Sequence, residues 1–314
     1  MGKTLLIDTS PIPDNPTTSH CRTIQEIAKA LSLPLISTSE ELKELNPSEF
    51  ENFVVIGSAF YPKTAEIESF IRRSKKPHIF WLNNEHTCSP NSEYARLIKD
   101  YPSTVISNLV EEGNKVRGYN RFILLNLNSL LMQQPNPLTQ KKYDILYYGT
   151  YRPGRRLYFQ KYFADADEFI LSSKTKNLRK FKQLAGCNCR FADSPQWIRG
   201  RESFNLVKYT IYLEDELMHK NFNHLSNRFY EALYCNVVQF FEETTRSTIE
   251  RHGVYKIPDR YFVTDKKSLV SKINEFDFDA CLVDQHQWAS IAIEEKKNVL
   301  KELKRIFDER QDFV

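Results

Sequence analysis

The segment that most constrains the fold is residues 143–156, where an apolar run meets glycine and then a group of arginines. Residues 143–148 are apolar and aromatic, which predicts a buried strand. Gly149 and the Pro153-Gly154 pair predict a tight loop, and residues 156–163 are typical of the start of a helix. In this order of elements, backbone N–H groups at the helix N-terminus can bind an anion.

Three arginines add to this anion-binding character. Arg152, Arg155 and Arg156 fall within five residues, and guanidinium groups bind phosphate through paired N–H donors. The segment therefore predicts a diphosphate-binding turn. The alternative interpretation is a solvated loop that happens to be basic.

Strand-like and helix-like segments alternate along the chain, and this alternation predicts an α/β protein with parallel, doubly wound sheets. The predicted strands are 4–8, 33–36, 53–58, 78–85, 104–108, 121–125, 143–148, 168–171, 210–213, 237–241 and 261–263. The first predicted helix is capped by residues 17–19 and extends to residue 31. The other predicted helices are 64–74, 156–163, 178–184, 199–207, 225–234, 267–275 and 288–310.

A chain of 314 residues is long enough for two domains, each with its own core. Residues 133–137 are polar and contain two prolines, which is typical of a linker. We therefore expect domains at 1–134 and 135–314, with the C-terminal helix able to cross back to the first domain. Two doubly wound domains can place their carboxyl-end crevices opposite each other, so the cleft between them is the expected ligand site.

Composition excludes several classes of protein. No apolar run has the length of a membrane span, and Met1-Gly2-Lys3 leads directly into a strand, so we expect a cytoplasmic protein without a signal peptide. The net charge of +4 is mild and does not by itself indicate nucleic-acid binding. The six cysteines lack zinc-site spacing, which favours free thiols in a reducing compartment.

A second informative segment is 227–233, which has helical character. Arg228 and Glu231 are three residues apart and so share one face near the helix N-terminus. A carboxylate in this place can accept hydrogen bonds from two ribose hydroxyls while the arginine faces phosphate. The alternative is a surface ion pair, which contributes little to stability.

Glu85 ends the predicted strand 78–85 and faces the expected cleft. A carboxylate there can act as a general base and remove a proton from an incoming hydroxyl. A solvated acid at a strand end is the alternative, and three histidines are rival bases: His20, His86 and His224.

Two Asp-x-Asp triplets, at 165–167 and 277–279, are interpreted as solvated turns rather than metal ligands. Basic clusters at 72–76 and 174–182 could follow a phosphate backbone, although a solvated helix face explains them equally well. The residues that we consider for contact with nucleic acid or ligand are Phe60, Tyr61, Arg72, Arg73, Lys75, Lys76 and Trp197.

Residues 149–156 resemble the Gly-Ser-Phe-Arg-Ser-Gly-Gln-Arg loop of the T-even phage DNA β-glucosyltransferase family. The sequence Arg-Phe-Tyr-Glu at 228–231 is similar to the Arg-Val-Trp-Glu of that family, at a similar separation. Residues 79–85 correspond to the strand that ends in the family's catalytic aspartate. The resemblance covers most of the chain in order.

The resemblance implies a GT-B glycosyltransferase that uses a UDP-sugar and modifies a hydroxymethylated pyrimidine in phage DNA. The first domain would bind DNA and the second would bind the donor. Glu85 would replace the aspartate base, with a side chain one methylene longer, and the family's upstream acidic residue falls near Arg22. The implied donor-site residues are Gly149, Thr150, Arg152, Arg156 and Arg228 for the diphosphate, Glu231 for the ribose, and 191–197, with Trp197, for the uracil.

The implied reaction is a single displacement with inversion, in which the target base is flipped out of the duplex. Phe60 and Tyr61 could fill the gap that the base leaves. The expected acceptor is 5-hydroxymethylcytosine in double-stranded DNA, and the sugar is glucose by default, with arabinose or another pentose as alternatives. We expect a monomer in the host cytoplasm without a resident cofactor, with a divalent metal as a possible stimulant that no recognisable motif binds.

Two rival interpretations stay open at this point. One is a GT-B transferase that acts on a cell-surface glycan or a small molecule. The other is a non-catalytic protein that binds nucleotide or DNA through the same fold.

Overall fold

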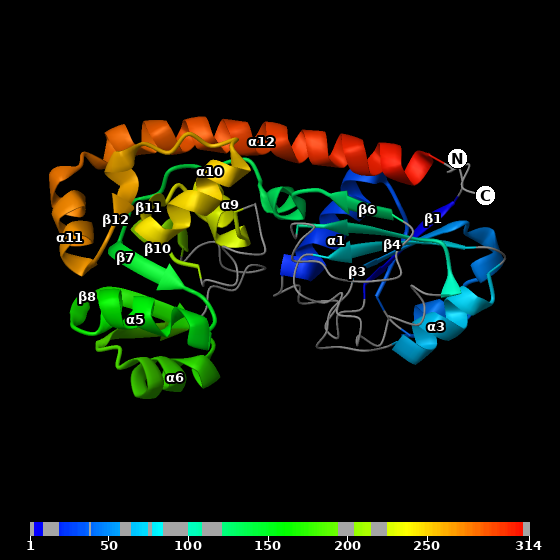
Figure 1. Ribbon diagram of the computed structural model, residues 1–314, viewed down its shortest axis with the longest axis horizontal. Coiled ribbons are helices and arrows are strands. Elements are labelled where there is room, and N and C mark those ends of the chain that lie inside the picture. Colours follow the sequence, from blue (N-terminus) through cyan, green and yellow to red (C-terminus); the bar gives the residue numbers. More distant parts are fainter. Residues whose placement is uncertain are drawn as a thin grey trace. The chain divides into compact units, whose positions relative to one another are not determined.

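The computed structural model describes residues 3–8, 19–37, 39–56, 64–74, 77–83, 100–108, 121–193, 204–214 and 225–309 (Figure 1). The chain forms two compact units. Unit 1 comprises residues 1–131 and 295–314, and unit 2 comprises residues 132–294. Each unit contains a six-stranded sheet.

The sheet of unit 1 has the strand order β2-β1-β3-β4-β5-β6, and all its strand pairs are parallel. Its strands are nearly continuous apolar runs because helices cover both faces. Residues of alternate parity along β1 and β3 belong to two separate apolar clusters, one on each face. The strands are β1 (Thr4–Asp8), β2 (Leu35–Ile36), β3 (Asn52–Ile56), β4 (His78–Asn83), β5 (Ser103–Ser107) and β6 (Arg121–Leu124).

Helices α2 (Ser39–Glu44) and α3 (Thr64–Arg72) contribute buried side chains to one of these clusters. The other cluster takes its helical residues from α1 (Ser19–Leu31) and from the end of the long helix α12 (Phe278–Asp308). Short 3-10 turns lie at Pro47–Glu49 and Leu127–Leu131.

The sheet of unit 2 has the order β12-β11-β10-β7-β8-β9 and is also parallel throughout. From β7 the chain first builds outward through β8 and β9, then returns to the other side with β10. The reversal between β7 and β10 is a topological switch point, where doubly wound sheets bind ligands at the carboxyl ends of the strands. The strands are β7 (Tyr143–Tyr148), β8 (Ala166–Ser173), β9 (Cys189–Asp193), β10 (Val207–Tyr212), β11 (Val238–Glu242) and β12 (Phe262–Val263).

One large apolar cluster, rich in tyrosine and phenylalanine, forms the core of unit 2. The helices α5 and α6 lie side by side next to this sheet (Figure 1). The helices that the structure describes in unit 2 are α5 (Arg156–Phe163), α6 (Thr175–Ala185), α9 (Asn227–Tyr234), α10 (Arg246–His252), α11 (Lys266–Glu275) and the first part of α12, with 3-10 turns at Pro153–Arg155, Glu243–Thr245 and Asp259–Tyr261.

The predicted doubly wound parallel sheets are confirmed, with local corrections. Strand β9 and helices α2 and α10 were not predicted, and Val207 begins β10 rather than ending a helix. The last helix begins at Phe278, ten residues before the predicted start. Asp277 accepts a hydrogen bond from the backbone N–H of Ala280 at 2.9 Å, so part of the second Asp-x-Asp triplet caps this helix.

The cysteines that the structure describes at positions 187, 189, 235 and 281 are free thiols. Burial raises the pKa of Cys187 and of Cys189 to about 12, which keeps both thiols protonated near neutral pH. Within the described ranges, no helix is long and apolar enough to cross a membrane.

Candidate functional site

The candidate site lies at the switch point of unit 2, at the carboxyl ends of β7 and β10. The arginine loop follows β7 directly and leads through the turn Pro153–Arg155 into α5. Leu213 and Glu214 follow β10. Because the strands are parallel, these two chain segments meet at the same edge of the sheet.

Gly149 shows how closely the loop approaches α9. A Cβ atom on Gly149 would lie 3.0 Å from Tyr147 Oη and 3.4 Å from Arg228 Nη1. The backbone N–H of Gly149 donates to Ser172 O at 3.1 Å, and its carbonyl accepts from Ser173 Oγ at 2.5 Å. A residue without a side chain therefore lets the guanidinium of Arg228 lie against the loop.

Glu214 is the charged centre of the site. Its side chain is only 4% exposed, and its carboxylate accepts hydrogen bonds from Arg155 Nη2 and Arg228 Nη2. Burial alone would raise the pKa of Glu214, but the two guanidinium groups outweigh burial and lower this pKa to about 2. Glu214 is therefore an anion at neutral pH.

Arg228 is held by more than one contact. Its Nη2 also donates to Leu213 O at 3.2 Å, and its guanidinium carbon lies 5.8 Å from the centre of the Tyr147 ring. Burial opposes the charge of Arg228, but Glu214 raises the pKa of the guanidinium above its ordinary value. The side chain thus carries a fixed positive charge beside the glycine loop.

The other loop residues differ in their surroundings. Arg152 is half-buried and precedes the turn, where its carbonyl accepts from the backbone N–H of Arg155 at 3.0 Å. Arg156 begins α5 and is exposed, as is Thr150. Arg155 was grouped with the phosphate-binding arginines in the sequence, but it is 2% exposed and pairs with Glu214.

Glu231 lies one turn after Arg228 on α9 and is fully buried. Its carboxylate accepts a hydrogen bond from Tyr148 Oη at the end of β7, and Asn227 Nδ2 lies 3.4 Å from each of its oxygens. The structure thus brings Glu231, Arg228 and the glycine loop to the same strand end.

The loop after β7 and helix α9 carry four arginines on the described residues, and Glu214 and Glu231 are two buried carboxylates of the site. The N-termini of α5 and α9 face the same sheet edge, because each helix follows a strand that ends there. Partial positive charge at these helix ends adds to the excess of arginine. The arrangement is suited to a dianionic or trianionic ligand such as a diphosphate.

Sequence reasoning missed Glu214 and the role of Arg155. The available signal was the position of Glu214 directly after the predicted strand 210–213, which is the argument used for Glu85. Glu214 lies 59 residues from Arg155, so only the fold shows that the two side chains pair.

Several predicted site residues lie outside the described residues. These are Phe60, Tyr61, Lys75, Lys76, Glu85, His86, Trp197 and His224, together with the side chain of His20. Arg72 and Arg73 are described and exposed. Arg72 pairs with Glu68 at 2.8 Å and with Asp100 at 2.7 Å, so acidic neighbours compensate its charge.

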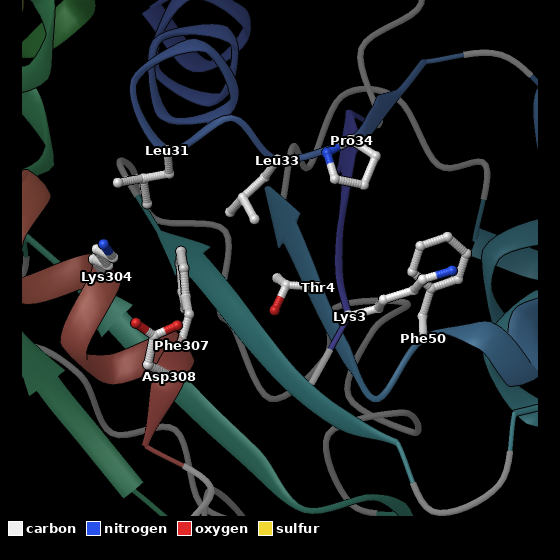
Figure 2. A pocket seen from close by; sticks show the side chains of 9 residues that line it. All are labelled: Lys3, Thr4, Leu31, Leu33, Pro34, Phe50, Lys304, Phe307 and Asp308. Atoms are coloured by element: carbon white, nitrogen blue, oxygen red, sulfur yellow. The ribbon is translucent and has the colours of Figure 1, made fainter. Parts of the chain in front are cut away.

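Unit 1 contains a separate cavity of about 480 Å³ near the amino ends of its strands (Figure 2). Its walls are mostly apolar, and its polar groups are Thr4 and the charged residues Lys3, Lys304 and Asp308. Ligands of doubly wound sheets bind at the carboxyl ends of the strands. This cavity is therefore not the crevice that the sequence predicts for a substrate.

No group of three histidine, cysteine, aspartate or glutamate side chains that could hold a metal ion occurs in the part of the chain that the structure describes. No protein-family model matches the sequence, and no curated protein matches it.

Solved structures are similar to the whole chain. The T4 phage β-glucosyltransferase in complex with UDP-glucose has a TM-score of 0.76 and 16% sequence identity, covering 97% of this chain and 99% of that one. The same T4 enzyme with UDP and Mn²⁺ has a TM-score of 0.75 and 15% identity over 97% and 99% of the two chains. An α-glucosyltransferase with UDP and a 13-mer DNA containing an HMU base has a TM-score of 0.67 and 8% identity over 96% and 100%.

These similarities extend over both units and agree with the two parallel six-stranded sheets. The chain therefore has the two-domain GT-B fold that the resemblance implied.

Proposed function

We propose that the protein is a UDP-sugar-dependent glycosyltransferase that modifies a hydroxymethylated base in double-stranded DNA. The observation that carries this proposal is the arginine-rich site at the switch point of unit 2, where Arg228 lies against Gly149. Support comes from the similar T4 phage β-glucosyltransferase, solved with UDP-glucose, and from the similar α-glucosyltransferase, solved with UDP and DNA.

In this proposal the donor diphosphate lies on the loop after β7. Arg152, Arg156 and Arg228 neutralise its oxygens, and the backbone N–H and hydroxyl of Thr150 add neutral donors. The backbone N–H of Gly149 is already bonded to Ser172 O, so this glycine provides space for the diphosphate rather than the expected donor. Negative charge grows on the departing UDP during transfer. Guanidinium groups and helix N-termini that are fixed before the reaction stabilise this charge without reorganisation.

Glu231 would hold the ribose hydroxyls, and Trp197 would lie near the uracil. Glu231 has no exposed surface, since Tyr148 and Asn227 lie against its carboxylate. Ribose binding at Glu231 therefore requires one of these two side chains to move aside.

On the acceptor side, we propose Glu85 as the general base. It would take the proton of the hydroxymethyl oxygen while this oxygen attacks the anomeric carbon of the sugar, and UDP would leave from the opposite face with inversion. The target base must leave the duplex to reach the donor, and Phe60 and Tyr61 would occupy the space that it vacates. Residues Arg73, Lys75 and Lys76 would contact phosphates, and Arg72 would do so on release from its ion pairs with Glu68 and Asp100.

The preferred acceptor is 5-hydroxymethylcytosine and the preferred sugar is glucose, with arabinose or another pentose as the alternative donor. We expect a monomer that holds no resident cofactor. A divalent cation bound together with the donor would add positive charge to that of the arginines.

The test is a UDP-release assay with duplex DNA that contains 5-hydroxymethylcytosine, 5-hydroxymethyluracil or only unmodified bases. UDP-glucose, UDP-arabinose and other UDP-sugars serve as donors. Release that needs both a hydroxymethylated base and one donor supports the proposal. Release with a glycan acceptor alone would favour a transferase of other substrates, and UDP binding without release on any acceptor would favour a non-catalytic protein.

A further inference from the structure

The basic charge of this chain is concentrated in one part of unit 2. Residues 149–192 contain ten lysines and arginines against three acidic residues, a net charge of +7, whereas the whole chain carries +4. The rest of the chain is therefore net acidic. A local excess of this size on a nearly neutral protein indicates a polyanionic partner for that surface.

Helix α6 carries much of this charge. It has no acidic residue, and Arg179, Lys180 and Lys182 are exposed, while Phe181 and Ala185 on its opposite face are buried in the core of unit 2. Within the described residues, these three basic side chains form no ion pair. Lys174 at the N-terminus of α6 and Arg190 in β9 are also exposed and basic.

The surroundings of α6 differ from those of other basic helices in the chain. On α3, Arg72 is paired with Glu68 and Asp100. On the last turns of α12, Arg305 is paired with Glu302 and Glu309. A solvated helix normally mixes charges in this way, so the single-sign face of α6 is not explained by solubility alone.

This basic face begins beside the candidate donor site. Lys174 directly follows Ser173, whose hydroxyl donates to the carbonyl of Gly149 at 2.5 Å. Arg156, at the start of the neighbouring helix α5, is exposed as well. The eleven residues of α6 extend this positive surface by about 16 Å, which is the length of about five base steps of duplex DNA.

We propose that the exposed basic face of α6, formed by Lys174, Arg179, Lys180 and Lys182, binds the phosphate backbone of the duplex that is being modified. Unit 2 then contributes to DNA binding in addition to the residues expected on unit 1. The identity of the polyanion rests on the proposed function. Lysine and arginine contacts to phosphates carry no base preference, so this surface holds the duplex without selecting the sequence.

The test compares two triple variants of the full chain that lose the same charge. One is Arg179→Gln, Lys180→Gln and Lys182→Gln on α6. The control is Lys256→Gln, Lys267→Gln and Lys301→Gln, which are exposed lysines elsewhere. Binding to a fluorescent duplex containing 5-hydroxymethylcytosine is measured by anisotropy between 50 and 200 mM salt, without donor, and the UDP affinity of each protein is measured separately.

Affinity for DNA falls as salt concentration rises, with a slope of about −0.9 in log affinity against log salt for each phosphate contact. Loss of three contacts should therefore make the slope of the α6 variant less steep by about 2.7. The control should keep the wild-type slope, and both variants should keep the wild-type affinity for UDP. An α6 variant with the slope of the control would overturn the inference. Sugar transfer is measured separately. A slope difference without any sugar transfer would support DNA binding by α6 and reject the proposed activity. Sugar transfer without a slope difference would support the proposed activity and reject DNA binding by α6.

Discussion

Substitution of Glu214 by glutamine tests whether this carboxylate holds the arginines of the site. Glutamine keeps the shape of the side chain but removes its charge, which leaves two buried guanidinium groups without their shared counter-ion. The loss of one partner from a buried ion pair costs about 3–5 kcal/mol. Glu214→Gln should therefore destabilise unit 2 while the fold persists.

The pKa of Glu214 gives a second route to the magnitude. The folded protein lowers this pKa from 4.5 to about 2, and a shift of this size is worth about 3 kcal/mol. The folded-state pKa is depressed, so the stabilisation is complete above pH 4.5 and is lost as the pH falls toward 2. At pH 3 it should be roughly 1.4 kcal/mol.

The assay is thermal unfolding of the wild type, Glu214→Gln and the control Glu250→Gln, whose carboxylate is exposed on α10. For a unit of about 160 residues, a loss of about 3 kcal/mol should lower the Tm by about 6–12 °C at pH 7. The difference from wild type should be less than half as large at pH 3. A Tm at pH 7 within 2 °C of the control, or a difference that does not shrink with pH, would refute the reasoning.

Three further changes test the site. Arg228→Ala should lower kcat/KM for sugar transfer by about 10- to 150-fold, which corresponds to the loss of one charged hydrogen bond in the transition state. Steady-state kinetics at saturating DNA measure this ratio, and an unchanged kcat/KM would exclude contact between Arg228 and the diphosphate. Gly149→Ala should weaken UDP binding, because its new Cβ would crowd Tyr147 and Arg228. Calorimetry measures the affinity for UDP, and equal affinity of the wild type and the variant would contradict the importance of this close approach. Glu85→Gln should abolish transfer and keep UDP affinity, and a turnover close to wild type would remove Glu85 from the role of base.

Patterns that are local in the sequence predicted most of the fold. The apolar run 143–148, Gly149 and the start of α5 were recognised because each depends on neighbouring residues alone. The alternation of strands with helices predicted the parallel sheets, whereas the order of strands within each sheet comes from the structure. Strand β9 was not predicted, because it is a short, half-buried strand at the edge of its sheet and its sequence has no continuous apolar run.

The missed parts depend on contacts between distant residues. Nothing near Glu214 in the sequence indicates that Arg155 and Arg228 converge on it. The triplet at 277–279 is typical of a turn when read locally, but Phe278 packs against the apolar core and continues into a helix of 31 residues. The start of this helix is therefore determined by tertiary packing rather than by the local sequence pattern.

The measurement that tests the central claim most directly is mass spectrometry of nucleosides. Duplex DNA containing 5-hydroxymethylcytosine is incubated with the protein and UDP-glucose, digested and compared with the same duplex treated with Arg228→Ala. We predict a new nucleoside heavier by one hexose residue in the wild-type sample and little of it in the variant. If hydroxymethylated nucleosides remain unchanged with every UDP-sugar, while the protein is folded and binds UDP, the proposed DNA glycosyltransferase activity is wrong.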